Sequence, residues 1–240
     1  MIKKRGANMI CDMCGEEYSD EFEFCIYCGA YPTMSCPNCL SIKKDNSKIC
    51  SECGNELLPI EKVYHYFNLE DEAFSYYEKG KYEKAIEIYE MILHDLPNIE
   101  NIHYLLARNY RALGDYDKGL KQLEKLAEIN PNYVGVWRGI GKEYFRQGDY
   151  EKAEEYLLKE HAIHPTERGH LIYLMFICFE KGNFKRANKI LDYFFSINPY
   201  KSCFEFLNEE IENKLETGKY GQELVDINER VKDHMKKNNK

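Results

Sequence analysis

The sequence predicts a mainly α-helical protein, in which a solenoid of stacked helix pairs follows two small β-hairpin modules that bind metal. Two internal repeats indicate this fold class. Eight of the ten cysteines lie within the first 53 residues as four Cys-x-x-Cys pairs, and glycine and proline recur every 34 residues in the remainder of the 240-residue chain. Paired cysteines are typical of tetrahedral metal sites, and a 34-residue period is typical of helix–turn–helix solenoids.

The eight N-terminal cysteines form two equivalent sets, since each cysteine of the first set recurs 25 residues later. Two residues between paired thiols let both sulfurs reach one ion, and two such pairs complete a tetrahedron. The duplication favours two self-contained sites over an interleaved arrangement. We expect site 1 to consist of Cys11, Cys14, Cys25 and Cys28, and site 2 of Cys36, Cys39, Cys50 and Cys53. A glycine follows the second cysteine of three pairs, and Leu40 takes that place after Cys39.

Zinc is the metal that these sites favour, at two ions per chain. Iron is an alternative, because a four-thiolate site also holds iron in rubredoxins. Four disulfides are a second alternative, but they need an oxidising compartment. No apolar segment follows the basic residues 3–5, so no signal peptide is visible and we expect a cytoplasmic protein. Cys178 and Cys203 have no cysteine at ligand spacing, and we interpret them as packing thiols.

Residues 10–31 (ICDMCGEEYSDEFEFCIYCGAY) and 35–58 (SCPNCLSIKKDNSKICSECGNELL) resemble the short zinc-ribbon module of bacteria and archaea. The two copies in tandem resemble the double zinc ribbon. This resemblance implies a metal site on a small β-hairpin scaffold in each copy. Modules of this kind bind nucleic acid or proteins, so the resemblance does not identify a partner.

Four columns of residues keep the 34-residue period through the remainder of the chain. They are Gly80, Gly114, Gly148 and Gly182; Tyr82, Tyr116, Tyr150 and Phe184; Ala85, Gly119, Ala153 and Ala187; and Pro97, Pro131, Pro165 and Pro199. The glycine suits the turn between two helices, because it adopts a left-handed backbone at little cost. The small residue lets the helices approach closely, and the proline ends the second helix.

These blocks, such as GKYEKAIEIYEMILHDLPN, resemble tetratricopeptide repeats. The resemblance implies a non-catalytic array of helix pairs whose first helices line a concave, partner-binding groove. We expect the chain to be organised as follows: tandem ribbons 1–58, a short linker 59–65, repeats 66–99, 100–133, 134–167 and 168–201, and a degenerate fifth repeat with a capping helix 202–240.

A basic stripe is predicted along the first helices of the second and third repeats. Its expected members are Tyr104, Arg108, Arg111, Arg138, Lys142 and Arg146. Aromatic residues are expected on both sides, namely Phe74 and Tyr77 before the stripe and Phe176 and Phe179 after it. Such a groove suits an acidic peptide. The alternative is an ordinary solvated face that neighbours such as Asp115 and Glu143 neutralise, and the Lys/Asn pattern of the family's carboxylate clamp is not found.

Composition disfavours other classes of function. The net charge is −8, whereas generic nucleic-acid binding relies on a basic surface. The longest apolar run, residues 171–179, is too short to span a bilayer. No glycine-rich phosphate loop and no nucleophile–base signature occurs in the sequence, so we expect no enzymatic activity. His161 and His164, at a helix end, are interpreted as satisfied or exposed side chains.

The sequence therefore predicts a cytoplasmic, non-catalytic adaptor with structural zinc and a peptide-binding groove. The ribbons would form a rigid head or a second protein contact. One alternative is a nucleic-acid-associated regulator that uses the ribbons, although residues 6–31 contain six acidic residues and no Lys or Arg. A further alternative is electron transfer through iron-loaded ribbons.

Overall fold

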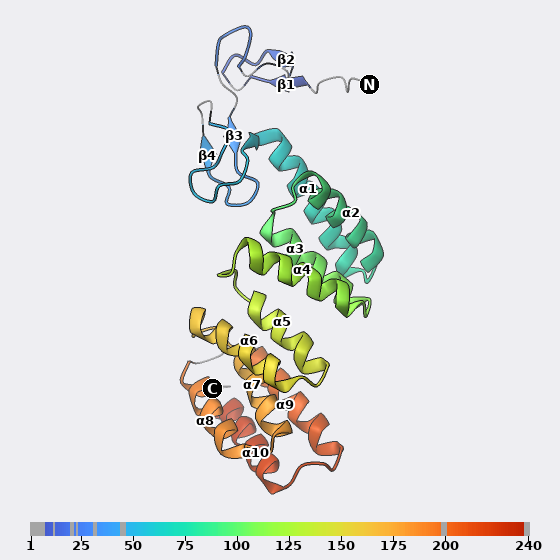
Figure 1. Ribbon diagram of the computed structural model, residues 1–240, viewed down its shortest axis with the longest axis vertical. Coiled ribbons are helices and arrows are strands. Elements are labelled where there is room, and N and C mark those ends of the chain that lie inside the picture. Colours follow the sequence, from blue (N-terminus) through green and yellow to red (C-terminus); the bar gives the residue numbers. More distant parts are fainter. Residues whose placement is uncertain are drawn as a thin grey trace. The chain divides into compact units, whose positions relative to one another are not determined.

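The computed structural model describes residues 8–11, 13–19, 22, 24–30, 33–43, 47–197 and 201–237. It divides into two compact units, residues 1–122 and 123–240 (Figure 1). Pro199, the last member of the proline column, lies outside the described residues, as do the acidic residues Asp12, Asp20, Glu21 and Glu23 of the first cysteine module.

The strands all lie in the two N-terminal cysteine modules of the described chain. In the first module, β1 (Asn8–Ile10) pairs antiparallel with β2 (Glu17–Ser19), and Ile10 lies opposite Glu17. In the second module, the sheet order is β4-β3-β5, with β3 (Met34–Ser35) antiparallel to β4 (Ile42–Lys43) and to β5 (Leu58–Pro59). These short hairpins confirm the β-hairpin scaffold that the cysteine motif predicted.

The described chain continues as ten helices in antiparallel pairs (Figure 1). They are α1 (Ile60–Glu78), α2 (Tyr82–Asp95), α3 (Glu100–Ala112), α4 (Tyr116–Ile129), α5 (Val136–Arg146), α6 (Tyr150–Ile163), α7 (Gly169–Glu180), α8 (Phe184–Ser196), α9 (Lys201–Glu216) and α10 (Gln222–Lys237). The four glycines of the repeated column lie between paired helices with φ between 66° and 81°. The aromatic residue two positions later begins the second helix each time.

The segment expected as a linker is helical from its second residue, because α1 begins at Ile60. Pro59 precedes the first turn with φ −50°, a value close to that of a helix, and proline has no N–H that a helix start would leave unpaired. The N–H of Ile60 donates to the carbonyl of Thr33 at 3.0 Å. The second cysteine module thus continues directly into the first helix.

Small residues bring the paired helices together as the sequence predicted. Ala73 of α1 and Ala85 of α2 are fully buried in the core of the first unit. Gly141 of α5 meets α6 so closely that an added Cβ would lie 2.9 Å from the side chain of Leu157. A larger residue at Gly141 would therefore separate the two helices or distort the core.

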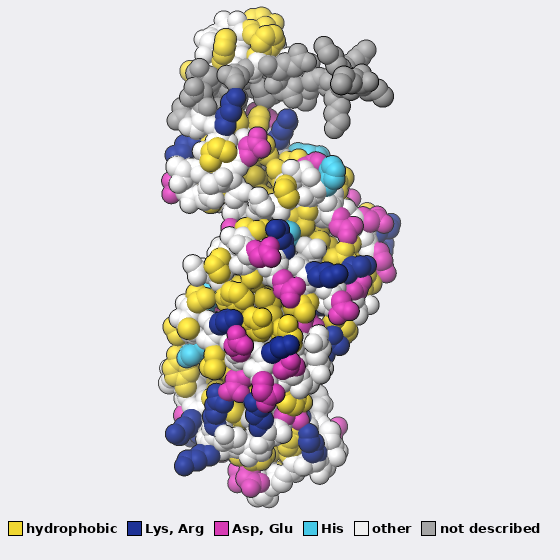
Figure 2. Space-filling view, viewed as in Figure 1, with side chains coloured by type: hydrophobic (Ala, Val, Ile, Leu, Met, Phe, Trp, Pro, Cys, Tyr) yellow, Lys and Arg dark blue, Asp and Glu magenta, His cyan; other side chains and the backbone are white. Residues whose placement is uncertain are grey.

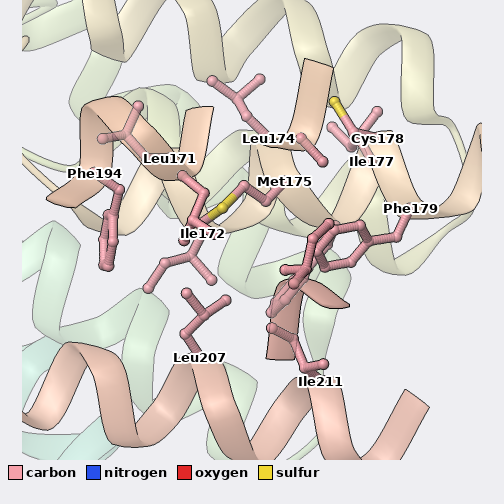
Figure 3. Close-up of a cluster of buried hydrophobic side chains, with 14 of the residues drawn as sticks. Leu171, Ile172, Leu174, Met175, Ile177, Cys178, Phe179, Phe194, Leu207 and Ile211 are labelled. Carbon is pink, nitrogen blue, oxygen red and sulfur yellow. The ribbon is translucent and has the colours of Figure 1, made fainter. Parts of the chain in front are cut away.

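Helix α7 forms the centre of the core of the second unit. It is apolar on all sides, and every residue from His170 to Phe179 is buried except Tyr173. Figure 3 shows Leu207 and Ile211 of α9 pointing toward the α7 side chains. Phe176 and Phe179 are only 2% and 1% exposed, so the expectation that they flank a groove was wrong. The neighbouring helices cover them because α7 has no polar face to present to water.

No helix of the described residues is both long enough and apolar enough to cross a membrane.

Candidate functional site

Each cysteine pair lies in a turn of the same backbone form. The N–H of the residue after the second cysteine donates to the carbonyl of the first cysteine, at 2.8 Å for Gly15 and Gly29, 2.9 Å for Gly54 and 3.0 Å for Leu40. These four residues have positive φ, between 61° and 76°. Glycine adopts this conformation freely, whereas Leu40 adopts it at a cost, since its Cβ crowds the backbone. The turn is therefore retained even where the sequence departs from glycine.

These turns bring the cysteines together in two groups of four. Cys11, Cys14, Cys25 and Cys28 form one group, and Cys36, Cys39, Cys50 and Cys53 form the other; within each, all sulfurs lie within 4.8 Å of one another. The Sγ atoms of Cys11 and Cys28 are 3.5 Å apart, and those of Cys36 and Cys53 are 3.4 Å apart. A tetrahedron with Zn–S bonds of about 2.3 Å has sulfur–sulfur edges of about 3.8 Å, whereas a disulfide measures about 2.05 Å. The groups therefore fit zinc and are not disulfides.

The surroundings shift the pKa values of these thiols in both directions: burial raises the pKa of Cys36 to about 12, whereas hydrogen bonds lower those of Cys11 and Cys50 toward the thiolate that a metal requires. A hydrogen bond from the backbone at Cys14 lowers the pKa of Cys11 to about 7. A hydrogen bond with the hydroxyl of Ser41, 3.0 Å away, lowers the pKa of Cys50 to about 6, and the N–H of Glu52 also donates to that sulfur. Four thiolates would fill all four positions of a tetrahedral zinc ion. Such a site has no open position for a substrate, so its chemistry is structural.

The predicted basic residues of the first unit lie on α3, where Arg108 faces α1 and Arg111 packs against Gly119 of α4. The guanidinium of Arg108 lies 4.8 Å from the centre of the Tyr77 ring, and its Nη2 donates to the Tyr77 hydroxyl at 3.2 Å. Tyr77 in turn stacks on Phe74, which is 44% exposed. Tyr104 and Arg111 are half-buried on the same helix. The structure thus places Arg108 beside the two aromatic residues that the sequence predicted as its flank.

The predicted basic residues of the second unit lie on α5 and have different surroundings. The ammonium of Lys142 lies 5.5 Å from the centre of the Tyr173 ring of α7. The side chain of Arg138 packs so tightly against Gly169 that an added Cβ there would lie 2.7 Å from its Nη1. Arg146 forms an ion pair with the buried Glu143 at 3.2 Å. Glu143 therefore neutralises Arg146, as the alternative interpretation of the stripe expected. Lys142 and Arg138 instead pack on α7.

Comparison with known families agrees with both halves of this structure. The family model of the double zinc ribbon matches residues 11–54. Three models of the tetratricopeptide repeat match residues 60–91, 76–140 and 135–159. The chain is a double zinc ribbon joined to tetratricopeptide repeats.

Solved structures show the same helical fold. A crystal structure of MamA matches with a TM-score of 0.53 and 17% identity, covering 69% of this chain and 95% of that one. A double mutant of MamA RS-1 matches with a TM-score of 0.54 and 13% identity, covering 72% and 96%. MamA from Desulfovibrio magneticus RS-1, in a form that runs from residue 41 to its end, matches with a TM-score of 0.52 and 14% identity, covering 72% and 92%. No curated protein matches the chain.

The second ribbon contacts the repeats through its first turn, a contact that sequence reasoning missed. The Asn38 side chain accepts from the N–H of Glu100 at 3.2 Å and donates to the Glu100 carboxylate at 2.9 Å. Ile99, which precedes α3, makes no side-chain cap, so Asn38 supplies an acceptor to the unpaired N–H groups of this helix start. Beside it, Pro37 lines an apolar cleft together with Val63 and Ile99. The second ribbon therefore caps the first repeats.

Replacement of Asn38 by Ala is expected to destabilise the first unit by about 1 kcal/mol, the usual cost of losing a helix cap. Urea unfolding of the zinc-loaded chain would measure this loss, and hydrogen exchange would place it at the start of α3. Ser51→Ala is the matched control, because Ser51 lies at the surface of the other turn of this ribbon and bonds only to Glu52 among the partners that the described residues supply. Equal effects of both substitutions would contradict the capping role.

Sequence reasoning also did not identify the buried acid Glu160. Glu160 of α6 is fully buried, and its carboxylate accepts from the N–H of Gly135 at 2.8 Å and from the N–H of Arg138 at 3.3 Å. Glu160 thus accepts hydrogen bonds from backbone N–H groups at the start of α5, as Asn38 does at the start of α3. No local signal could have shown either contact, because each polar residue reaches a helix start more than 20 positions away.

Proposed function

We propose that this protein is a non-catalytic interaction scaffold, in which zinc makes the ribbons rigid and the basic faces of the repeat helices bind an acidic protein segment. The observation that carries the proposal is the contact of Arg108 with Tyr77 of α1 and of Lys142 with Tyr173 of α7. Arg108 and Lys142 are 34 positions apart and therefore equivalent in the repeat, and each lies over a tyrosine of a neighbouring first helix. Tetratricopeptide arrays bind partners through this helix face.

The zinc part of the proposal is two ions per chain, held by the two four-cysteine groups. The spacing of the eight ribbon cysteines suits metal ions and not disulfides, which need an oxidising compartment, and we propose that the protein is cytoplasmic. Because each site has four thiolates and no open position, zinc would act on folding and not on a substrate. An all-sulfur tetrahedron also fits iron, so elemental analysis of the purified chain decides between the two metals.

We infer an acidic partner from the local positive charge at Arg108 and Lys142, and not from the charge of the whole chain. The chain has a net charge of −8, so an acidic segment is repelled from most of its surface. Arg108 and Lys142 supply local positive charge, and their tyrosines hold it in place through cation–π contacts. A carboxylate that also offers an apolar neighbour would contact both the cation and the adjacent aromatic residue. We therefore infer a partner segment that mixes Asp or Glu with apolar residues.

The test is a binding titration of the zinc-loaded chain with fluorescein-labelled peptides of about ten residues in which Glu or Asp alternates with Leu or Phe. Arg108→Glu and Lys142→Glu, made separately, are each expected to weaken binding about tenfold, which corresponds to about 1.4 kcal/mol. Affinity should also fall as salt rises, because screening acts over about 10 Å at 0.1 M. Arg138 is not used, since its side chain packs tightly against Gly169 and a change there would disturb folding.

Matched controls separate this face from a general charge effect. Lys121→Glu and Lys125→Glu make the same change of charge on α4, where both side chains are exposed. They are expected to change affinity less than twofold. The proposal fails if the α4 variants weaken binding as much as the first-helix variants, or if peptides with Gln and Asn in place of the acids bind equally well.

A further inference from the structure

The two ribbons share one backbone form but present different surfaces. In the first ribbon, six large apolar side chains are exposed: Ile10 63%, Met13 78%, Phe22 46%, Phe24 46%, Ile26 50% and Tyr27 62%. At the equivalent positions, 25 residues later, the second ribbon has Ser35, Asn38, Ser47, Ile49, Ser51 and Glu52. Five of these six are polar. The difference lies in surface chemistry and not in the metal site.

These apolar side chains lie outside the buried cluster of the first ribbon. Its buried cluster in the described residues consists of Cys11 and Cys25, with Ala30 packed against them. The second ribbon keeps the same turns with polar residues at the equivalent places, so the fold does not require apolar residues there. Exposed apolar groups outside the buried cluster, gathered on one small module, mark an interaction surface. In Figure 2, hydrophobic side chains gather at the upper end of the view, above the grey atoms.

The second ribbon shows how a turn of this type meets a protein surface. Its first turn, with Pro37 and Asn38, contacts the repeat helices through an apolar cleft and a helix start. In the first ribbon, Met13 occupies the position equivalent to Asn38, and the second turn presents Ile26 and Tyr27. The equivalent turn of the first ribbon therefore offers Met13 for a contact of the same kind, and its second turn adds Ile26 and Tyr27; all three are at least half exposed.

Charge decides the class of the partner. Residues 6–31 contain Asp12, Glu16, Glu17, Asp20, Glu21 and Glu23 and no Lys, Arg or His. Four thiolates around one dication add a further charge of about −2. Nucleic acids and anionic lipid surfaces are repelled by this module. The second ribbon has the same charge at its metal site, but its other side chains balance, since Lys43, Lys44 and Lys48 offset Asp45, Glu52 and Glu56.

We propose that the first ribbon binds a basic protein segment, whose apolar side chains pack on Met13, Ile26 and Tyr27 while its Lys or Arg residues meet acidic side chains of the same module, such as Glu16 and Glu17. This surface lies on a different module from the repeat helices and has the opposite charge preference. The chain would thus hold an acidic segment on its helices and a basic segment on its first ribbon. Neither site depends on the other, so each is tested independently.

The experiment begins with a random twelve-residue peptide library displayed on phage and selected on the full zinc-loaded chain. Selected peptides are then synthesised and titrated by fluorescence anisotropy. Peptides that bind the first ribbon should combine at least two Lys or Arg with two or more apolar residues. The test variant carries Met13→Asn, Ile26→Ser and Tyr27→Gln, which resemble the residues of the second ribbon and keep the charge. Binding should weaken at least 30-fold.

The control variant carries Leu40→Asn, Ile42→Thr and Ile49→Thr in the second ribbon. These three side chains are 51%, 55% and 59% exposed, so the control also replaces three exposed apolar side chains by polar ones. Asn tolerates the positive φ of Leu40. Binding should change less than twofold. A second test variant, Glu16→Gln with Glu17→Gln, should weaken binding several-fold at low salt and little at high salt.

An NMR measurement on the unmodified chain keeps the result independent of variant folding. Addition of a selected basic peptide should shift backbone signals of residues 10–30 and leave those of the helices unchanged. The proposal is overturned if no basic peptide is selected, if the shifts fall on the helices, or if the two triple variants bind equally. Metal analysis of each variant should still give two ions per chain, and a loss of binding counts only where it does.

Discussion

Removal of zinc is expected to unfold both ribbons while the helices of the second unit stay folded. Each ribbon buries little besides its cysteines: the core of the second ribbon is Cys36, Cys50 and Leu57 with Met34 beside them. So small a core cannot offset the entropy of an ordered chain, whereas structural zinc contributes about 10–16 kcal/mol in small metal domains. Chelation followed by circular dichroism and hydrogen exchange should therefore show loss of protection at the ribbon amides with little loss of helical signal.

Loss of the metal from site 1 and loss of the metal from site 2 are expected to unfold regions of different extent. Cys11→Ser with Cys14→Ser should release one metal and expose only the first ribbon. Cys36→Ser with Cys39→Ser should release one metal and, in addition, increase exchange at the start of α3, because Asn38 lies between the two replaced cysteines and caps Glu100. The difference measures the coupling between the second ribbon and the first repeats.

Cys178→Ala is the control for these variants. Cys178 is a buried packing thiol of α7, so its loss should leave two metal ions per chain. Fewer than two tightly held metals in the unmodified chain, or a collapse of the helical signal on chelation, would contradict this account. Equal exchange patterns for the two cysteine double variants would show that the Asn38 contact carries no stability.

Acid is expected to weaken the second unit through His170. This side chain is fully buried at the start of α7, and its Nε2 lies 3.0 Å from Nδ1 of His161. Its Nδ1 is buried without a hydrogen-bond partner among the described residues. Burial lowers the pKa of His170 to about 3, and positive charge on His161, Arg138 and His164 acts in the same direction. The folded protein therefore holds His170 neutral.

The direction of the pH effect follows from this lowered pKa. The unfolded chain binds a proton on His170 below about pH 6.5, whereas the folded chain does so only near pH 3. Stability from neutral His170 is complete above pH 6.5 and is lost as the pH falls. The loss is about 1.4 kcal/mol per pH unit, which gives about 2 kcal/mol between pH 6.5 and pH 5.

Trp137, the single tryptophan of the chain, reports on this unit from α5. Its fluorescence during urea unfolding at several pH values would give the free energy of unfolding without interference from the ribbons. His170→Gln keeps a nitrogen near the place of Nε2 and cannot titrate, so it should remove most of the slope between pH 6.5 and pH 5. His94→Gln is the control, since the His94 side chain is 87% exposed. An unchanged slope in His170→Gln would refute the assignment.

The sequence by itself determined the organisation of this protein. The 25-residue duplication predicted the two four-cysteine groups that the structure brings together, because a metal site with Cys-x-x-Cys pairs is assembled from local turns. The 34-residue columns predicted the helix pairs for a similar reason. A turn glycine and a small packing residue act within one repeat, so their spacing shows directly in the sequence.

Only the tertiary structure decided which side chains are available to a partner. Phe176 and Phe179 were expected at a groove and lie in the core, because helices distant in sequence cover α7. Asn38 reaches a helix start 62 residues away, and Glu160 reaches one more than 20 residues away. Burial and such long-range hydrogen bonds depend on how separate helices meet. The spacing of residues along the chain does not specify contacts between separate helices, so these contacts could be identified only in the folded structure.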